Sequence, residues 1–403
     1  MTWIVKKNRI EKESFLATLY ELNEKSGVDP EVIELLIAYV KLRINNDKTL
    51  NLYVQGPGSK SPQGLDDFLK KNNHLDSRSS AFLSNYFLEL HRKGLVTVFN
   101  REHLASILDT PLEKLENLSS SVSNSYSRFQ ISKKSGGERE ILAPYPELKL
   151  VQRRILDDLL QWVPVSKHAE GYRKNKSILS NAQHHVGKTI VVKIDLKDFF
   201  PTITFSRVKG VFSDLGYPEQ VSKMVADLTT YRGRLPIGSP ASPAISNIIC
   251  RKMDARFSGL GKKLGFSYSR YADDLAFSSD NSKLLKNLSF IESIIVDEGF
   301  VINKSKYQIV RNGRRQRVTG IVVNEKPNIA RESIRNMRAT LHNCKKYGFL
   351  HEAKREAKIK NLNSDDLVDV GQFKRSLLGK INHVKMVNEA VGINLLSDFN
   401  KAV

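Results

Sequence analysis

The sequence has little cysteine, no long apolar run and no internal repeat, and each shortage excludes a class of protein. Its two cysteines, Cys250 and Cys344, can form neither a disulfide framework nor a metal cluster. Apolar stretches such as Val32–Val40 are short and interrupted by charge, unlike a membrane span. A repeat of about 20–50 residues, which a solenoid needs, is not visible. Met1–Lys7 lacks the apolar core of a signal peptide, so we expect a cytoplasmic protein with reduced thiols.

Acidic residues are also few: 43 of them stand against 64 basic residues, which gives a formal charge of +21. Such an excess favours a polyanionic partner. An anionic membrane surface is the alternative, but no segment of the sequence resembles an anchor. We therefore expect no membrane partner.

At 403 residues the chain is long enough for two or three lobes, each with its own core. We expect a mainly helical extension over residues 1–103, an α+β region over residues 104–326 and a basic helical segment over residues 327–403. Within the extension, Ala81–Val98 predicts a helix that runs into a short strand at Val96–Phe99. This pattern is typical either of a winged-helix element or of a plain helical cap.

The α+β region alternates strands and helices. Leu104–Leu118 predicts one helix, and Ser206 is expected to cap another. The β-branched run Thr189–Ile194 predicts a buried strand, and Phe266–Ser279 predicts two strands folded back over a turn. Val318–Val323 predicts a further strand. This order favours a small sheet with helices on one side.

Three acids stand where the predicted strands end. Asp195 follows Thr189–Ile194, and Asp273 and Asp274 lie at the tip of the Phe266–Ser279 hairpin. A carboxylate at the buried end of a sheet is costly unless it is paired or holds a cation. Neighbouring strands would gather three carboxylates, and Mg²⁺ would relieve their repulsion. Two ions about 3.5–4 Å apart suit phosphoryl transfer. The alternative is that Asp273-Asp274 only turns a hairpin.

These residues also resemble a known family. Tyr271–Asp274 resembles the signature of reverse transcriptases, and Asp195–Phe200 resembles their first catalytic motif. Leu235–Pro243 is similar to the loop and helix between those two motifs. The resemblance covers about residues 104–325, and four ordered motifs are a far stronger signal than one. It implies a right-hand polymerase fold, with fingers and palm over residues 104–326 and a thumb over residues 327–403.

The resemblance implies roles for individual residues. Asp195, Asp273 and Asp274 would be the catalytic acids that hold two Mg²⁺ ions, with the backbone carbonyl of Leu196 as a further ligand. Phe200 would stand against the sugar 2′ position and reject a ribose hydroxyl, so that DNA is made. The alternative for Phe200 is an ordinary core position beside its neighbouring phenylalanine.

Four further residues are expected to contact the incoming nucleotide. The resemblance assigns Lys134 and Arg139 to a basic fingers strand that contacts the triphosphate, and Gly238 to a place near the nascent base pair. It makes Lys306 a candidate proton donor to pyrophosphate. Solvated basic side chains remain the alternative for the lysines and the arginine. Ile237 departs from the family, since many reverse transcriptases have a glutamine there, which puts the details of nucleotide contact in doubt.

Two short elements narrow the resemblance. Asn181–His185 resembles the Asn-Ala-x-x-His element of retron reverse transcriptases, and Val318–Gly320 resembles their Val-Thr-Gly element. The retron resemblance implies a cognate structured noncoding RNA and deoxynucleotides as substrates. It also implies priming from an RNA 2′-hydroxyl, a branched RNA–DNA hybrid (msDNA) as product, and antiphage defence with an effector protein. Asn181 and His185 would position an RNA backbone; the alternative is a helix end where both satisfy local backbone groups.

Basic side chains gather after the palm. The residues that we expect to bind RNA there are Arg314, Arg315, Arg317, Arg331, Arg335 and Arg338. The last three share one helical face because they are spaced by four and three residues, as a phosphate-tracking surface requires. A solvated charged face is the alternative, and the net charge counts against it.

Three other functions compete with the retron polymerase. One is a group II intron-like or CRISPR-associated reverse transcriptase, which the two retron elements argue against. Another is a non-catalytic RNA-binding scaffold, which the three acids argue against, because purposeless buried carboxylates destabilise a fold. The last is a DNA-binding regulator that carries a polymerase fold, which the possible winged helix raises.

Overall fold

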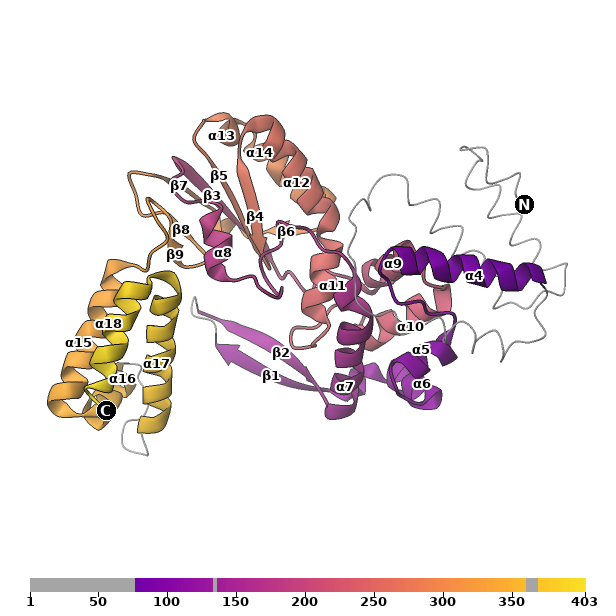
Figure 1. Ribbon diagram of the computed structural model, residues 1–403, viewed down its shortest axis with the longest axis horizontal. Coiled ribbons are helices and arrows are strands. Elements are labelled where there is room, and N and C mark those ends of the chain that lie inside the picture. Colours follow the sequence, from indigo (N-terminus) through magenta and orange to yellow (C-terminus); the bar gives the residue numbers. More distant parts are fainter. Residues whose placement is uncertain (1–76, 133–135, 360–368) are drawn as a thin grey trace. The chain divides into compact units, whose positions relative to one another are not determined.

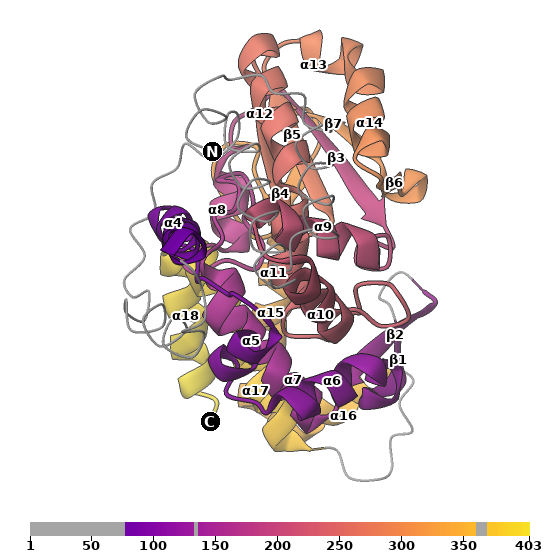
Figure 2. The ribbon, with the colours of Figure 1, turned by 90° about the vertical axis from the view of Figure 1, so that its right-hand side faces the viewer.

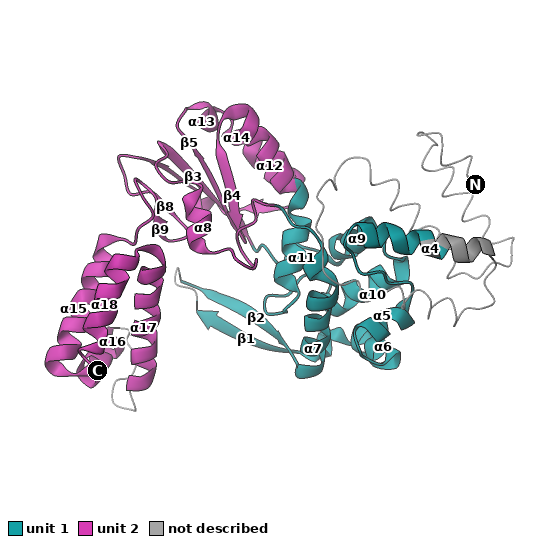
Figure 3. Cartoon of the chain, viewed as in Figure 1, with its two compact units in different colours: residues 1–166, 198–252 teal, residues 167–197, 253–403 magenta. Residues whose placement is uncertain are grey.

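The computed structural model describes residues 77–132, 136–359 and 369–403. The chain divides into two compact units (Figure 3). The first contains residues 1–166 and 198–252, and the second contains residues 167–197 and 253–403. Lys134 and most of the expected N-terminal extension lie outside the described residues.

The first unit is mainly helical (Figure 1). Its helices are α4 (Ser77–Arg92), α5 (Arg101–Ile107), α6 (Leu112–Ser120), α7 (Pro146–Arg154), α9 (Phe205–Leu215), α10 (Glu219–Thr229) and α11 (Ser242–Ile249). Short turns of other helix types lie at η2 (Val122–Ser125), η3 (Ile155–Leu159) and η4 (Leu160–Trp162). Strands β1 (Tyr126–Ser132) and β2 (Glu138–Pro144) form an antiparallel ribbon.

Two helix predictions in this unit are wrong in detail. The expected helix Leu104–Leu118 is split into α5 and α6, because Asp109 has a positive φ of 43° and Pro111 takes the N-cap position of α6. Thr204 caps α9 by accepting a hydrogen bond from the Arg207 N–H, so Ser206 lies inside the helix and is not its cap.

The strand expected at Val96–Phe99 is also wrong, since no strand lies between α4 and α5 in the described chain. Thr97, Val98 and Phe99 are instead buried without forming a strand, and the Tyr86 hydroxyl donates a hydrogen bond of 3.1 Å to the Val98 carbonyl. The missing strand argues against a winged-helix element at this position, and the helical cap stays a prediction.

The second unit contains a five-stranded antiparallel sheet. Its strands are β3 (Ile190–Lys197), β4 (Ser267–Tyr271), β5 (Asp274–Ser279), β6 (Val301–Ile302) and β7 (Gln308–Arg311). Their order is β4-β5-β3-β6, and β7 also pairs with β3. The β-branched run of β3 is buried almost throughout, as a central strand requires. The predicted strand at Thr189–Ile194 and the predicted hairpin at Phe266–Ser279 are therefore confirmed, although β3 runs on through Asp195 to Lys197 and so contains Asp195.

Both faces of this sheet are covered (Figure 2). Phe257 of α12 (Arg251–Leu264) contacts Tyr268 and Phe277 on one face, at ring-centroid distances of 4.9 and 5.0 Å. On the other face α8 (Ile178–Gln183) joins a small core that contains Ala182, Val191 and Ala276. The expectation of helices on one side only is therefore wrong. Three further helical elements lie between β5 and β7: α13 (Lys283–Lys286), α14 (Leu288–Asp297) and η5 (Lys304–Lys306).

The expected strand Val318–Val323 is a hairpin instead. Strand β8 (Arg317–Val318) pairs with β9 (Ile321–Val322). Thr319 and Gly320, which turn the chain between them, have positive φ values of 47° and 87°. The Val-Thr-Gly element is thus the turn of a hairpin.

Four helices end the chain: α15 (Arg331–Tyr347), α16 (Phe349–Ile359), α17 (Val370–Val387) and α18 (Glu389–Asn400). They share a core to which Leu341, Leu377, Ile381 and Leu395 contribute. The helical, basic character expected beyond residue 327 is confirmed for the described residues. Among the helices described, none combines the length and apolar character needed to cross a bilayer.

Candidate active site

The pairing of β3 with β5 brings the predicted acids together. Asp195 lies directly opposite Asp274 in the antiparallel register. Side chains in such a pair share one face of the sheet, with Cβ atoms roughly 4.5–5.5 Å apart. Asp273 lies in the connection between β4 and β5, and its carbonyl accepts a hydrogen bond of 3.0 Å from the Leu196 N–H. The last residues of β3, the β4–β5 turn and the first residue of β5 thus bring three carboxylates together.

The turn Tyr271–Asp274, called the acidic turn below, is strained. Tyr271 pairs with Asp274, which leaves Ala272 and Asp273 as a two-residue loop. Ala272 has a positive φ of 59°. A positive φ at the first loop position is typical of a type II′ turn, where glycine is favoured. An alanine there costs about 1–2 kcal/mol, so contacts around the turn must maintain its shape.

The Asp195 carboxylate is bound on both oxygens. Lys306 Nζ lies 2.9 Å from Oδ1, and the Asn303 side-chain amide donates to Oδ2 at 2.9 Å. The Asn303 backbone N–H also donates to the Asp195 carbonyl at 2.8 Å. Asn303 was not among the predicted site residues, although it lies only three residues before Lys306.

Burial and mutual repulsion destabilise the charged acids. The pKa of Asp273 is raised to about 6, mainly by burial and then by the Asp274 carboxylate. Burial, with repulsion from Asp195, also raises the pKa of Asp274. The hydrogen bond to Asp195 raises the pKa of Lys306. The site therefore favours added positive charge.

This donor set fits a divalent ion in its chemistry. As the side chains lie, no group of three or more histidine, cysteine, aspartate or glutamate residues in the described ranges is arranged to hold a metal. The Asp195 carboxylate faces Lys306 and Asn303 instead. Oxygen donors that repel one another are nonetheless what Mg²⁺ binds, and its charge would relieve the repulsion that Lys306 relieves in part. The Leu196 carbonyl as a ligand stays a prediction.

The other nucleotide candidates lie on both units. Arg139 is exposed on β2, and Phe200 is partly buried with its ring 5.3 Å from that of Phe199. Gly238 has a φ of 126°, and a Cβ there would come within 2.4 Å of the Leu142 carbonyl oxygen. The protein backbone alone therefore requires glycine at this position. These residues belong to the first unit, whereas Lys306 belongs to the second with the acids.

Asn181 and His185, which we expected to contact RNA, lie inside the second unit with exposed fractions of 1% and 0%. Asn181 accepts a hydrogen bond of 2.5 Å from Ser269 Oγ. The His185 ring nitrogens lie 2.7 Å from the hydroxyls of Ser269 and Ser278. Asn181 also donates to Thr319 in the Val-Thr-Gly turn at 3.4 Å.

These bonds join α8 and the residues that directly follow it to both strands of the β4–β5 hairpin. A phosphate cannot reach either side chain in this arrangement, because protein hydroxyls occupy their polar atoms. The geometry therefore argues against direct RNA contact. It also differs from the alternative in which both satisfy local backbone groups, since their partners are distant hydroxyls.

The six arginines expected to bind RNA are all exposed. Arg331, Arg335 and Arg338 share a face of α15, as their spacing predicts. Within the part of the chain that the structure describes, none of the six is paired with an acid. They are placed as a nucleic-acid surface requires, and their role stays a prediction.

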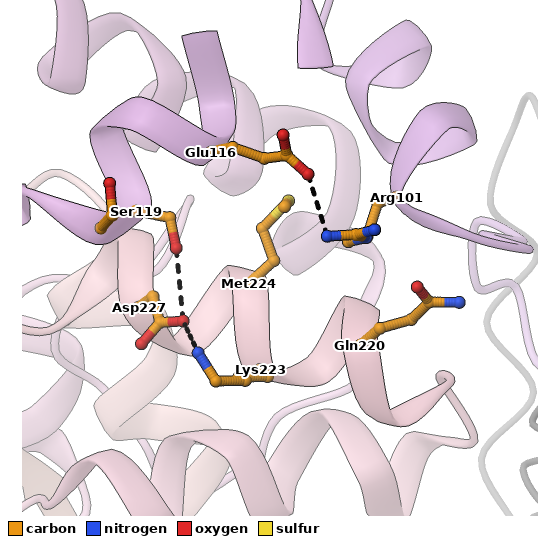
Figure 4. A pocket seen from close by; sticks show the side chains of 8 residues that line it. Arg101, Glu116, Ser119, Gln220, Lys223, Met224 and Asp227 are labelled. Carbon is orange, nitrogen blue, oxygen red and sulfur yellow. Dashed lines mark hydrogen bonds and ion pairs between the residues drawn. The ribbon is translucent and has the colours of Figure 1, made fainter. Parts of the chain in front are cut away.

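A surface pocket of about 520 Å³ lies between α5, α6 and α10 in the first unit (Figure 4). Its charges neutralise one another, because Arg101 pairs with Glu116 at 2.9 Å and Lys223 pairs with Asp227 at 2.7 Å. It contains none of the predicted site residues.

Comparison with known proteins agrees with this geometry. Residues 131–350 match the family described as reverse transcriptase (RNA-dependent DNA polymerase), which is more than half of the chain. The chain therefore belongs to the reverse transcriptase family, and the predicted α+β right-hand polymerase fold is confirmed.

Its relatives place it in the retron branch of that family. Retron Ec86 reverse transcriptase of Escherichia coli is 35% identical over 269 residues, which cover 66% of this chain and 83% of that protein. Two Myxococcus xanthus proteins are also similar. Retron Mx162 reverse transcriptase is 38% identical over 292 residues, and retron Mx65 reverse transcriptase is 37% identical over 282 residues. These alignments cover 63% and 65% of this chain, and this chain spans 60% and 61% of those two relatives.

Proposed function

We propose that this chain is an RNA-directed DNA polymerase that extends DNA at Asp195, Asp273 and Asp274 with two Mg²⁺ ions. The observation that carries the proposal is the register of β3 against β5, which sets Asp195 opposite Asp274 beside the acidic turn. The site lies within the stretch that matches the reverse transcriptase family.

The surrounding residues hold the acids for that reaction. The three acids would hold the ions, whose positive charge would supply activation of the attacking hydroxyl and stabilisation of the leaving pyrophosphate. Asn303 fixes the Asp195 carboxylate and backbone, so one metal-binding group has a set direction. Lys306, 2.9 Å from Asp195, is a charged donor that would protonate the pyrophosphate. Arg139, and Lys134 outside the described residues, would contact the triphosphate, while Phe200 excludes a ribose hydroxyl.

The partner that we propose is a cognate structured noncoding RNA. The retron relatives support this, as do the excess of basic residues and the exposed arginines before and along α15. Priming from an RNA 2′-hydroxyl would leave a branched RNA–DNA hybrid, and the complex would act in cytoplasmic antiphage defence with an effector protein. RNA affinity should fall steeply with salt, because phosphate contacts release counterions.

The direct test replaces Asp273 and Asp274 with asparagine together. DNA synthesis on the cognate RNA should fall by about 10³-fold or more, because charge stabilisation at the reacting phosphate is lost. RNA binding should persist. Asp280→Asn is the matched control, since Asp280 is an exposed acid just beyond the other end of β5 and pairs with Lys188. Retained synthesis in the double variant would overturn the metal assignment.

Sequencing the nucleic acid that copurifies with the wild-type protein separates this proposal from its rivals. A branched RNA–DNA species supports the retron reaction. Unbranched intron RNA would favour a group II intron-like enzyme, and CRISPR-derived RNA a CRISPR-associated one. Bound RNA with no DNA, from a protein that synthesises none, would favour a scaffold.

A further inference from the structure

A buried ion pair lies directly behind the acidic turn. Arg270 lies on β4 and directly precedes the acidic turn. Its side chain and that of Asp254 on α12 are both 0% exposed. The guanidinium binds the carboxylate with two parallel bonds, Nε to Oδ1 and Nη2 to Oδ2, each 2.9 Å long. The Tyr268 hydroxyl donates to the same carboxylate at 2.7 Å. The orientation of the guanidinium is therefore fixed.

The third nitrogen of this guanidinium reaches the turn itself. Arg270 Nη1 donates to the carbonyl of Ala272 at 3.3 Å. Ala272 is the residue whose φ is positive, so the bond falls on the strained peptide of the loop. The next carbonyl, that of Asp273, is held by the Leu196 N–H. Consecutive carbonyls of the acidic turn are thus held by residues of two different strands, β4 and β3.

The backbone of residue 270 is fixed as well. Its N–H donates to the His168 carbonyl at 2.8 Å, and its carbonyl accepts from the Glu170 N–H at 2.7 Å. Gly171 then passes so close to the turn that a Cβ there would lie 2.8 Å from the Ala272 nitrogen. The backbone of Arg270 is therefore held in place, and so is the starting point of the side chain that contacts the turn.

We propose that Arg270, clamped by Asp254, is a positioning residue that sets the backbone of the acidic turn and thereby the direction of the Asp273 and Asp274 carboxylates. This inference rests on the proposed polymerase function. A buried ion pair contributes little net stability compared with an apolar pair of similar size, so its best-attested use is to specify geometry. The contact with Ala272 shows which geometry is specified here.

Two variants test the inference. Arg270→Met with Asp254→Leu removes both charges together, so no unpaired ion is left in the core. Arg270→Lys keeps a positive charge beside Asp254 but loses the planar fork that reaches both the carboxylate and the turn. The control is Arg256→Met on the same helix, which breaks ion pairs of 2.8 and 2.9 Å to Asp297 and Glu298, away from the turn.

Four quantities are measured below the unfolding temperature of each folded variant: kcat, the KM for deoxynucleotide, the half-saturating Mg²⁺ concentration, and amide hydrogen exchange in a peptide over residues 268–275. The double variant should lose about 10²-fold in kcat, as a misplacement of about 1 Å costs. It should also need more Mg²⁺ and exchange faster, while the KM for deoxynucleotide changes less. Arg270→Lys should show the same pattern to a smaller degree, and Arg256→Met should match the wild type.

Wild-type kcat, Mg²⁺ requirement and exchange in the double variant would overturn the positioning role. If the double variant does not fold, Arg270→Lys decides by the same measurements. The inference and the proposed function can also fail separately. If the wild type makes no DNA but the variants still exchange faster over residues 268–275, the anchored turn is supported and the proposed function is wrong.

Discussion

The buried imidazole of His185 predicts a specific sensitivity to acid. Its ring lies between Ser269 and Ser278, and burial, followed by the neighbouring charge of His184, lowers its pKa to about 3. Ser269 gives its proton to Asn181, so it can only accept from the Nε2–H of His185. Nδ1 then accepts from Ser278. The neutral tautomer with its proton on Nε2 therefore satisfies both serines. A protonated ring would have no lone pair on Nδ1 to accept from the Ser278 hydroxyl.

The magnitude follows from the difference between the two states. In the unfolded chain the histidine has a pKa near 6.5, so below pH 6.5 the unfolded chain binds a proton that the folded protein does not. The free energy of unfolding therefore falls as the pH drops from 6.5 to about 3, by about 1.4 kcal/mol for each pH unit. At pH 5.0 the loss from this one residue is about 2 kcal/mol.

The assay compares urea unfolding of wild type and His185→Gln at pH 7.5 and pH 5.0. Glutamine keeps a donor and an acceptor but does not titrate, so the variant should be less stable at pH 7.5 and lose about 2 kcal/mol less on acidification. Carboxylate titrations occur in both proteins and cancel. The exposed His342→Gln controls for the loss of one imidazole. Equal acid sensitivity in wild type and His185→Gln would refute the neutral, buried state.

Three further predictions concern the nucleotide candidates. Gly238→Ala should lower the free energy of unfolding by more than about 1–3 kcal/mol in urea titrations, since its clash with the Leu142 carbonyl adds to backbone strain. Gly233 also has a positive φ, but a Cβ there would have no atom within 4 Å, so Gly233→Ala should lose only the free energy of backbone strain. Equal losses of unfolding free energy in the two variants would refute the clash at Gly238. Phe200→Ala should raise ribonucleotide incorporation relative to deoxynucleotide in primer extension; an unchanged ratio would remove its steric role. Lys306→Met should slow single-turnover incorporation about 10²-fold, and a change under about twofold would exclude proton donation.

The sequence predicts the elements that present the acids, because local pattern suffices for them. A β-branched run ending in Asp195 and a hairpin ending in Asp273-Asp274 need no distant contact to be recognised. The burial of Asn181 and His185 could not be predicted this way, since their partners lie 84 to 138 residues further along the chain. A motif shared with a family shows that its residues matter, and only the fold shows whether they face a ligand or the core.

Arg270 was missed for a related reason, although a signal was present. A charged residue in a strand predicted to be buried needs a partner. Nothing in the spacing identifies Asp254, which lies on a helix that precedes the strand. The splitting of Leu104–Leu118 is different, because Pro111 was visible and should have ended the predicted helix.

Strand β4 shows why this hairpin holds a strained turn. Its residues alternate in direction: Tyr268 and Arg270 bond Asp254 on the α12 face, and Ser269 bonds Asn181 and His185 on the α8 face. Burying polar groups on both faces costs desolvation free energy that apolar side chains would not. Their hydrogen bonds offset that cost only in the one arrangement in which every group is paired. A slip of one residue would exchange the two faces and leave every one of these groups unpaired. Such a strand has a single register, and that register fixes where the acidic turn begins.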